Sequence, residues 1–330
     1  MTNDNLSNAP ILLEVANLCV DFVNPGQPPA HALEDVSFML REGEMLGVVG
    51  ESGCGKSTLM LSLMRLLAPA GRITDGQVLF RDQDLLDLTE QQMTEVRWKN
   101  ISMIFQGAMN ALNPVRTVGS QIAEAIQLHY PAMPKGVLED RVGQLLEMVG
   151  ISANRKAQYP HQFSGGMRQR AVIAMALACN PQIVIADEPT TALDVMIQAQ
   201  ILELLDQLRT KLGLAILFVT HDLGVVAELC DTVLVMYGGV VAEYADVDTI
   251  YNDPRHPYTQ ELLKAFPDLS KPKGQLASIP GHPPRLDNLP PGCRFAPRCP
   301  AVFKQCRATQ PPLYTINQQH TARCYLVEDQ

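Results

Sequence analysis

The chain has 330 residues, of which 46% are hydrophobic and 18% charged, and its formal net charge at pH 7 is −9. This length suits one large domain with a small one, and the composition is that of a globular protein with a sizeable core. The negative charge argues against a nucleic-acid partner bound by phosphate neutralisation. The N-terminus lacks a basic stretch followed by an apolar core, and no apolar run has the roughly 18 residues of a membrane span, so a cytosolic location is expected.

The first elements predicted along the chain are strands. Ile11–Phe22 and Ala32–Leu40 have strand patterns and are separated by a Pro/Gly turn, and Met45–Val49 is a short apolar run typical of a buried parallel strand. Phe22 is a candidate for stacking on an adenine base. A core or edge aromatic is an equally good interpretation of this residue.

The next stretch, Gly50–Thr58, fits the pattern G-x-x-x-x-G-K-[ST] of a phosphate-binding loop, with a helix-like segment after it. Its glycines allow backbone angles that turn successive N–H groups toward a polyphosphate. Lys56 is expected to bind the β- and γ-phosphates, and the Ser57 hydroxyl to ligate Mg²⁺. The residues expected to contact the nucleotide here are Gly50, Ser52, Gly53, Cys54, Gly55, Lys56, Ser57 and Thr58.

The middle of the chain alternates short strands with helical patterns. Residues 77–80 and 101–105 have strand patterns, the second ending at Gln106, and residues 84–99 are polar and helix-prone. Apolar residues recur at helical spacing over about 117–149.

A second anion site is predicted at Ser164-Gly165-Gly166. These residues precede a helix that starts polar and becomes apolar all round, so the helix should be largely buried. A helix start of this composition leaves unpaired N–H groups that attract an anion.

Two further strands end in polar residues. The apolar run 183–186 is followed by Asp187 and Glu188, and the run 214–220 by His221. Parallel sheets bind ligands at the carboxyl ends of their strands. Asp187 can hold Mg²⁺ through water, Glu188 can polarise the attacking water, and the His221 imidazole can donate to a γ-phosphate oxygen. Residues 231–243 have the pattern of a closing hairpin.

With these motifs in this order, the chain resembles the ATP-binding cassette (ABC) ATPases over about residues 11–262. The motifs are the phosphate loop, the loop glutamine Gln106, the signature 164–170, the acidic pair 187–188, the segment 192–194 and the switch histidine His221. The resemblance implies an α/β fold: a P-loop NTPase (RecA-like) core with an antiparallel β-subdomain and a helical subdomain at about 88–163. It implies ATP and Mg²⁺ as cofactors, with Mg²⁺ held by Ser57, Gln106 and Asp187.

The resemblance also implies how the site works. Two cassettes pair head to tail, so Ser164, Gly165 and Gly166 act in trans on ATP held by the other subunit. Glu188 is the expected general base and His221 the γ-phosphate sensor. Gln106 contacts Mg²⁺ and the attacking water, and links the site to the helical subdomain, where a membrane partner docks.

The C-terminal part narrows the resemblance to the oligopeptide/dipeptide importer ATPases, through the stretch 254–263 and a cysteine-rich end. This implies a second ATPase subunit in a heterodimer, two transmembrane permease subunits and an extracytoplasmic solute-binding protein, at the cytoplasmic face of the bacterial inner membrane. Nickel, glutathione or an oligosaccharide are alternative solutes. The residues after Gln106, Gly107-Ala108, depart from the acidic residue and proline usual there. A soluble ABC ATPase acting on nucleic acid or the ribosome, and an iron–sulfur redox protein, are the alternatives of another class.

The last segment, expected at 263–330, differs in composition from the ATPase domain expected at 1–262. Residues 266–330 hold 11 of the 24 prolines and four of the eight cysteines. Four thiolates suit a [4Fe–4S] cluster or Zn²⁺, with disulfides or free thiols as the alternative. The resemblance favours a structural [4Fe–4S] cluster that holds a segment poor in regular structure, its charge offset by nearby arginines. The cysteines are Cys293, Cys299, Cys306 and Cys324, and the arginines are Arg294, Arg298, Arg307 and Arg323.

Overall fold

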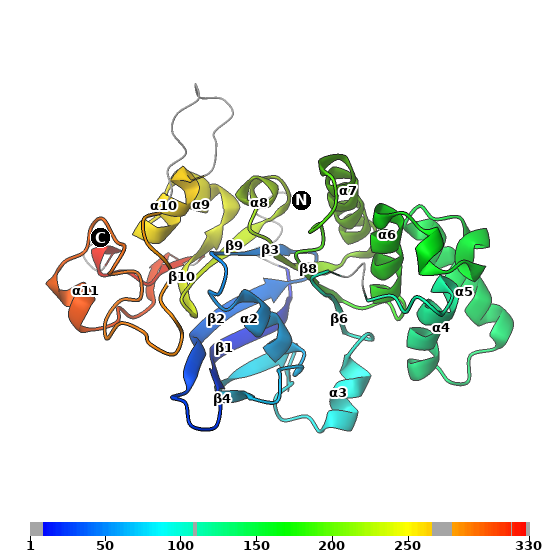
Figure 1. The fold of residues 1–330 in the computed structure, drawn as a ribbon, viewed down its shortest axis with the longest axis horizontal. Helices are drawn as coiled ribbons and strands as arrows, with labels where there is room; N and C mark the ends of the chain where they lie inside the picture. The colour runs from blue at the N-terminus through cyan, green and yellow to red at the C-terminus, as the bar shows by residue number, and fades with distance from the viewer. Residues whose placement is uncertain (1–8, 108–110, 266–278, 318, 328–330) are drawn as a thin grey trace. The chain divides into compact units, whose positions relative to one another are not determined.

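The computed structural model describes residues 9–107, 111–265, 279–317 and 319–327 (Figure 1). The chain divides into two compact units, the first formed by Met1–Leu86 with Thr220–Gln330 and the second by Asp87–Val219. The helical subdomain expected at about 88–163 falls within the second unit. Its bounds, like the expected domain boundary at 262, stay predictions.

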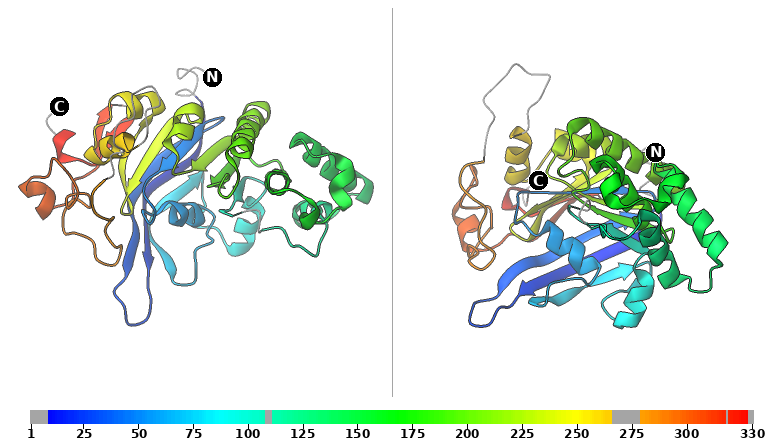
Figure 2. Two further views of the ribbon diagram at one scale, coloured as in Figure 1. Left: turned by 45° about the horizontal axis from the view of Figure 1, so that its top comes forward. Right: turned by 45° about the vertical axis from the view of Figure 1, so that its right-hand side comes forward.

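The first unit contains a four-stranded antiparallel sheet in the order β2-β1-β4-β5. Its strands are β1 (Ile11–Phe22), β2 (Ala30–Arg41), β4 (Gly71–Phe80) and β5 (Gln83–Asp84). The long β1–β2 hairpin is the blue pair of strands in Figure 2. The antiparallel β-layer expected near the N-terminus is therefore confirmed.

A second set of strands in the first unit carries the phosphate loop, in the order β11-β12-β10-β9-β3. The strands are β3 (Met45–Val49), β9 (Thr232–Tyr237), β10 (Val240–Asp246), β11 (Tyr314–Asn317) and β12 (His320–Ala322). β3 is buried along its whole length and runs parallel to β9. The expected hairpin is present as β9–β10.

The C-terminal segment has more regular structure than expected, because β12 extends this sheet by pairing with β10. Figure 1 shows this segment, orange to red, beside β10 and α10. The helices of the first unit are α2 (Lys56–Leu63), α8 (Leu223–Leu229), α9 (Val247–Asn252), α10 (Pro257–Lys264) and α11 (Lys304–Ala308). A 3₁₀ turn, η4 (Tyr325–Val327), ends the described chain.

The second unit contains three parallel strands in the order β8-β7-β6. They are β6 (Ile101–Ile104), β7 (Ile183–Asp187) and β8 (Ala215–Val219), and β7 and β8 are buried throughout. Such apolar strands match the prediction of a covered parallel sheet. The helices and 3₁₀ turns are α3 (Glu90–Val96), α4 (Val118–His129), α5 (Lys135–Met148), η2 (Ala153–Ala157), η3 (Pro160–Gln162), α6 (Gly165–Ala176) and α7 (Val195–Leu212).

One expected helix is shorter than its polar pattern predicts. Residues 84–99 begin with the end of β5 and a turn, and α3 starts only after Thr89. The Thr89 hydroxyl accepts from the N–H of Gln92, and the Gln92 side chain accepts from the N–H of Thr89. This reciprocal capping box fixes the helix start.

Trp98, the single tryptophan of the chain, lies just after α3. Its indole Nε1 donates to the carbonyl oxygen of Met175 at 3.0 Å, and its ring meets His129 edge-on at 6.5 Å. These contacts join α3, α4 and α6 within the second unit. In the described part of the chain, every helix falls short of the length and apolar character that crossing a bilayer requires.

Candidate functional site

The phosphate loop follows directly from β3 and owes its shape to its glycines. Gly50, Gly53 and Gly55 have φ angles of 148°, 81° and 105°, which L side chains rarely adopt. A Cβ on Gly50 would lie 2.2 Å from the carbonyl oxygen of Met236, and one on Gly55 2.8 Å from that of Ala32. The close approach of the neighbouring backbone therefore requires glycine at both positions.

The side chain of Lys56 lies over this loop. Its Nζ donates to the carbonyl oxygens of Gly50 at 2.7 Å and Glu51 at 3.3 Å, and the residue is buried. Helix α2 begins at Lys56 after Gly55, and no side chain caps its start. The first N–H groups of α2, the ammonium of Lys56 and the exposed Ser57 thus form a positively polarised end suited to an anion.

The other residues predicted to contact the nucleotide differ in their exposure. Ser52 is exposed and Thr58 half-buried, whereas the thiol of Cys54 is buried, and burial raises its pKa. A Cβ on Gly50 would meet the Cys54 sulfur at 2.8 Å, so Cys54 packs beneath the loop.

Phe22 is half-buried at the end of β1 and touches Gly71 on β4, so the described chain gives it an edge-of-sheet environment.

His221 is exposed and lies in the turn before α8. The Asp222 carboxylate accepts from the N–H groups of Gly224 and Val225, which caps α8 and fixes this turn. The N–H of Thr220 donates to the carbonyl oxygen of Val48 at 3.4 Å. His221 is therefore placed beside the end of β3, where the phosphate loop begins.

In the second unit, the acidic pair ends β7 as the sequence predicts. Asp187 is buried, and Glu188 follows it with a φ of 46°, a conformation uncommon outside glycine. The Glu188 carboxylate accepts from Nε2 of Gln106 at 2.8 Å and from the Thr191 hydroxyl at 3.0 Å. Two predicted residues, Gln106 and Glu188, are thus in direct contact, and the strained backbone at Glu188 is typical of a functional position.

The predicted second anion site lies at the start of α6. The Ser164 hydroxyl accepts from the N–H of Met167 at 3.3 Å, so Ser164 is the N-cap of this helix. Gly165 is the first residue of α6. A Cβ on Gly166 would lie 2.7 Å from the Cγ2 of Ile197 on α7, so close packing of these two helices also requires glycine here.

Comparisons with known proteins identify the family. The family model "ABC transporter" matches residues 33–191. The chain is 48% identical to the oligopeptide transport ATP-binding protein AppD of Bacillus subtilis, over 97% of this chain and 98% of AppD. The chain belongs to the ABC transporter ATPases.

Two further matches place this ABC ATPase more narrowly. The model "Oligopeptide/dipeptide transporter, C-terminal region" matches residues 242–306. The dipeptide transport ATP-binding protein DppD of Bacillus subtilis is 48% identical over 96% of this chain and 94% of DppD.

Solved structures confirm the cassette fold of this ABC ATPase. The ATP-binding cassette MJ0796, solved as a dimer with ADP and Pi, has a TM-score of 0.63 and 29% identity, covering 71% of this chain and 98% of that one. The fold expected from the motifs, a P-loop core with an antiparallel sheet and helical parts, is correct.

The predicted four-cysteine metal centre is wrong. Among the described residues, which include all eight cysteines, no group of three or more His, Cys, Asp or Glu side chains is placed to hold a metal ion. Cys306 instead packs with Ala296 and Tyr325 in a small apolar cluster, and Cys293 lies against it. Burial raises the pKa of Cys324 to about 11, which favours the neutral thiol at neutral pH. All eight cysteines are free, so disulfides do not hold the segment either.

Three of the four nearby arginines pair with carboxylates of this ABC ATPase instead of offsetting a cluster. The pairs are Arg294 with Glu34, Arg298 with Glu51 and Arg323 with Asp35. The three arginine side chains are only 2%, 5% and 6% exposed. Arg307, by contrast, is exposed.

The sequence reasoning missed several residues around the site. Thr191, which binds Glu188, and Tyr258, whose hydroxyl accepts from the N–H of Glu51 at 2.9 Å, carry no motif that identifies them. Arg298 was expected beside a metal cluster, yet it contacts the phosphate loop. The signal in the sequence for this contact was the opposite charge of Arg298 in the C-terminal segment and Glu51 in the loop.

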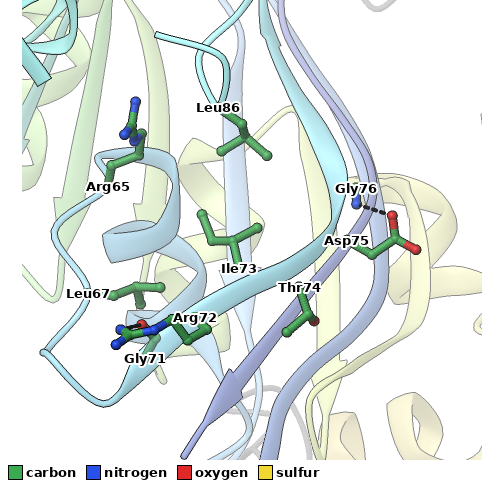
Figure 3. Close-up of a pocket in the computed structure, with 9 residues that line it drawn as sticks. All are labelled: Arg65, Leu67, Gly71, Arg72, Ile73, Thr74, Asp75, Gly76 and Leu86. Atoms are coloured by element: carbon green, nitrogen blue, oxygen red, sulfur yellow. Dashed lines mark hydrogen bonds between the residues drawn. The ribbon is translucent and has the colours of Figure 1, made fainter. Parts of the chain in front are cut away.

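The first unit also contains an open pocket of about 480 Å³ that is separate from the phosphate loop (Figure 3). It lies along the start of β4, and the nine described residues that line it are Arg65, Leu67, Gly71, Arg72, Ile73, Thr74, Asp75, Gly76 and Leu86. The Arg65 and Arg72 guanidinium groups both donate to backbone carbonyls. This lining shares no residue with the phosphate loop.

Proposed function

We propose that this chain is the ATP-hydrolysing subunit of an importer for dipeptides or oligopeptides. The observation that carries the proposal is a hydrogen-bonded set of three residues, Gln106 after β6 with Glu188 and Thr191 after β7, in a chain that also holds a formed phosphate loop. The peptide substrate rests on the names of relatives that are 48% identical over nearly the whole chain. Nickel, glutathione or an oligosaccharide are the alternative solutes.

The residues fit a nucleoside triphosphate with Mg²⁺. The positive-φ glycines of the loop and the uncapped start of α2 suit phosphate oxygens, and Lys56 supplies a charge. Cys54 and Ser52 contribute through the loop backbone, Thr58 through α2, and Phe22 is the proposed base contact. Ser57, Gln106 and Asp187 carry the oxygen atoms that Mg²⁺ prefers, and the metal offsets phosphate charge when bound.

The proposed chemistry is attack of water on the γ-phosphorus of ATP. The new bond joins the water oxygen to phosphorus, the bond to the β–γ bridging oxygen breaks, and ADP leaves with that oxygen while inorganic phosphate is released. The Glu188 carboxylate takes the proton from that water, and its hydrogen bonds from Gln106 and Thr191 hold it in one orientation. The imidazole of His221 donates to a γ-phosphate oxygen.

The proposed assembly is a pair of cassettes under a membrane permease. Ser164, Gly165 and Gly166 begin α6, and their N–H groups would contact the nucleotide held by the partner cassette. A heterodimer with a second ATPase, two permease subunits and an extracytoplasmic solute-binding protein complete the proposed importer. The chain would then lie at the cytoplasmic face of the bacterial inner membrane.

Replacement of the proposed base tests the reaction. We expect Glu188→Gln to bind ATP as the unmodified chain does and to lose about 10²–10⁴-fold in turnover, because the amide cannot accept the proton. Binding of a fluorescent ATP analogue and release of phosphate are the two measurements.

Glu147→Gln is the matched control, since Glu147 is exposed on α5. Near-normal hydrolysis by Glu188→Gln would exclude the proposed role. Uptake of labelled dipeptide by the importer reconstituted in vesicles tests the solute, and uptake of another of the named solutes instead would overturn the peptide assignment.

A further inference from the structure

An ion pair between a buried arginine and a half-buried carboxylate connects the C-terminal segment to the phosphate loop. Nη1 and Nη2 of Arg298 donate to the two carboxylate oxygens of Glu51 at 2.6 Å and 3.0 Å. Glu51 is the first residue after Gly50 in the loop. The bidentate geometry fixes the orientation of both planar groups.

Arg298 is itself held firmly. It donates to the carbonyl oxygens of Ile279 at 3.1 Å and Pro280 at 2.8 Å, and to the Tyr237 hydroxyl at 3.2 Å. Burial lowers the pKa of Arg298, but the hydrogen bonds to Glu51 and Tyr237 outweigh it, so the pKa is raised overall. The guanidinium is therefore a fixed positive charge.

The backbone of Glu51 is held as well. Its N–H donates to the hydroxyl of the fully buried Tyr258 on α10, and its carbonyl oxygen accepts from Lys56. Tyr258 packs against Tyr237 at 4.5 Å and against Phe295 at 5.3 Å between ring centroids. In the C-terminal segment, Phe295 thus packs against the tyrosine that binds the Glu51 backbone, and Arg298 binds the Glu51 carboxylate directly.

The charge of Glu51 makes this contact matter for binding. A carboxylate in a loop that binds a polyphosphate repels this ligand. At a partly buried site, the repulsion between two unit charges about 10 Å apart is large enough to weaken binding more than about tenfold. The Arg298 guanidinium neutralises that carboxylate and also directs it toward the C-terminal segment.

We propose that Arg298 is a positioning residue for nucleotide binding, which neutralises Glu51 and holds the phosphate loop in the shape that accepts a nucleoside triphosphate. This inference rests on the proposed ATP-binding function of the same loop. It gives the C-terminal segment a role in the affinity of the site.

The test compares MgATP affinity among full-length variants with a fluorescent ATP analogue. Arg298→Met should weaken binding about tenfold, because it leaves Glu51 unpaired near the phosphates. Arg298→Met combined with Glu51→Gln should restore binding to within about twofold, since it removes both charges together. In steady state the loss should appear in KM for MgATP, with kcat nearly unchanged.

Arg323→Met is the matched control, because the Arg323 side chain is about as buried as that of Arg298 and pairs with Asp35, a carboxylate outside the loop. We expect it to lower the unfolding temperature and leave MgATP affinity unchanged. Equal weakening by Arg323→Met, or no recovery in the Glu51→Gln double variant, would show a merely structural effect and overturn the inference.

Lys56→Ala separates the two proposals. If Lys56→Ala abolishes MgATP binding while Arg298→Met binds normally, the inference about Arg298 is wrong and the nucleotide site stands. If Lys56→Ala also binds normally, the loop is not the nucleotide site and the proposed function fails with it.

Discussion

Gly166 shows how a single residue can carry two requirements. It stands in the second position of α6, where a proposed anion contact needs free N–H groups, and a Cβ there would collide with Ile197. Glu188 is a second such residue, because its positive φ and its two hydrogen bonds both serve one carboxylate orientation. At both positions one residue therefore meets a backbone or packing requirement and a chemical one.

Gly166→Ala should therefore destabilise the fold although alanine is the better helix former. A Cβ at 2.7 Å from the Ile197 methyl forces α6 and α7 apart, and overpacking of this kind costs about 1–3 kcal/mol. The midpoint of urea unfolding measures the loss. Gly136→Ala is the control, since a Cβ there meets nothing within 4 Å and should not destabilise α5. Equal midpoints for the two variants would contradict the packing argument.

Residue-level prediction from the sequence succeeded where a backbone geometry demands one residue type. The glycines of the phosphate loop have the positive φ angles that the motif requires. Thr191 and Tyr258 could not be found, because a threonine or tyrosine hydroxyl suits many partners and only the fold decides which one it meets.

At the scale of elements, one buried carboxylate joins three of them. Glu243 on β10 is fully buried, and it accepts from the N–H groups of Arg255 and His256 before α10 and contacts His320 on β12. These hydrogen bonds outweigh burial and hold the pKa of Glu243 below its usual value. The pairing of β12 with β10 and the start of α10 therefore depend on the same ionised side chain.

His256, the N-cap of α10, makes stability depend on pH. Burial lowers its pKa from 6.5 to about 4. The Glu243 charge and a hydrogen bond with the Arg323 backbone oppose this shift, and the Arg323 charge adds to it. Between these values the unfolded chain binds the proton and the folded chain does not, so stability falls as pH falls from 6.5 toward 4. The loss approaches roughly 3 kcal/mol, and chemical denaturation at pH 7 and pH 5 measures its onset.

His256→Asn is the variant that isolates this effect, because asparagine can still accept from the N–H of Tyr258 as an N-cap but does not titrate in this range. Its unfolding free energy should change less between pH 7 and pH 5 than that of the unmodified chain. The lowered pKa of His129 contributes equally to both proteins and cancels in the comparison. Identical pH dependence in the two proteins would mean that His256 is not the titrating group.

Element prediction from the sequence was best for runs with one consistent burial pattern. β3, β7 and β8 are uniformly apolar and were located almost to the residue. β11 and β12 were missed because they are short, half-polar, and formed by pairing with β10 rather than by their own pattern. The crowding of four cysteines was misleading in the same segment, since Cys306 packs in an apolar cluster with Cys293 against it and the described residues form no metal-binding group.

At the scale of the whole molecule, charge complementarity ties the C-terminal segment to the rest of the first unit. Three buried arginines of this segment each meet a carboxylate from the N-terminal part of the chain. Removing the carboxylate of such a pair leaves a buried arginine uncompensated, which costs up to about 3–5 kcal/mol. The excess of basic residues in the C-terminal segment therefore serves contacts with the N-terminal part of the chain. The sequence alone did not reveal which residues pair.

The proposed pairing of cassettes predicts that turnover depends on concentration. A site whose second half comes from a partner subunit is complete only in the dimer, so ATP turnover per chain should rise with chain concentration until dimers predominate. Dilution of an equimolar mixture of the chain and the second ATPase subunit at saturating MgATP, with phosphate release as the readout, measures this. Constant turnover per chain across the dilution series would contradict a shared site.

The single tryptophan gives the molecule an optical property of practical value. Because Trp98 lies in the second unit, with its indole bonded to Met175 and its ring against His129, its emission reports the packing of α3, α4 and α6. The aromatic residues around the phosphate loop and the C-terminal segment are tyrosines and phenylalanines, including Tyr237, Tyr258 and Phe295. Excitation at 295 nm would follow the second unit alone, while far-ultraviolet circular dichroism would follow both, so unlabelled protein suffices to learn whether the two units melt together or one at a time.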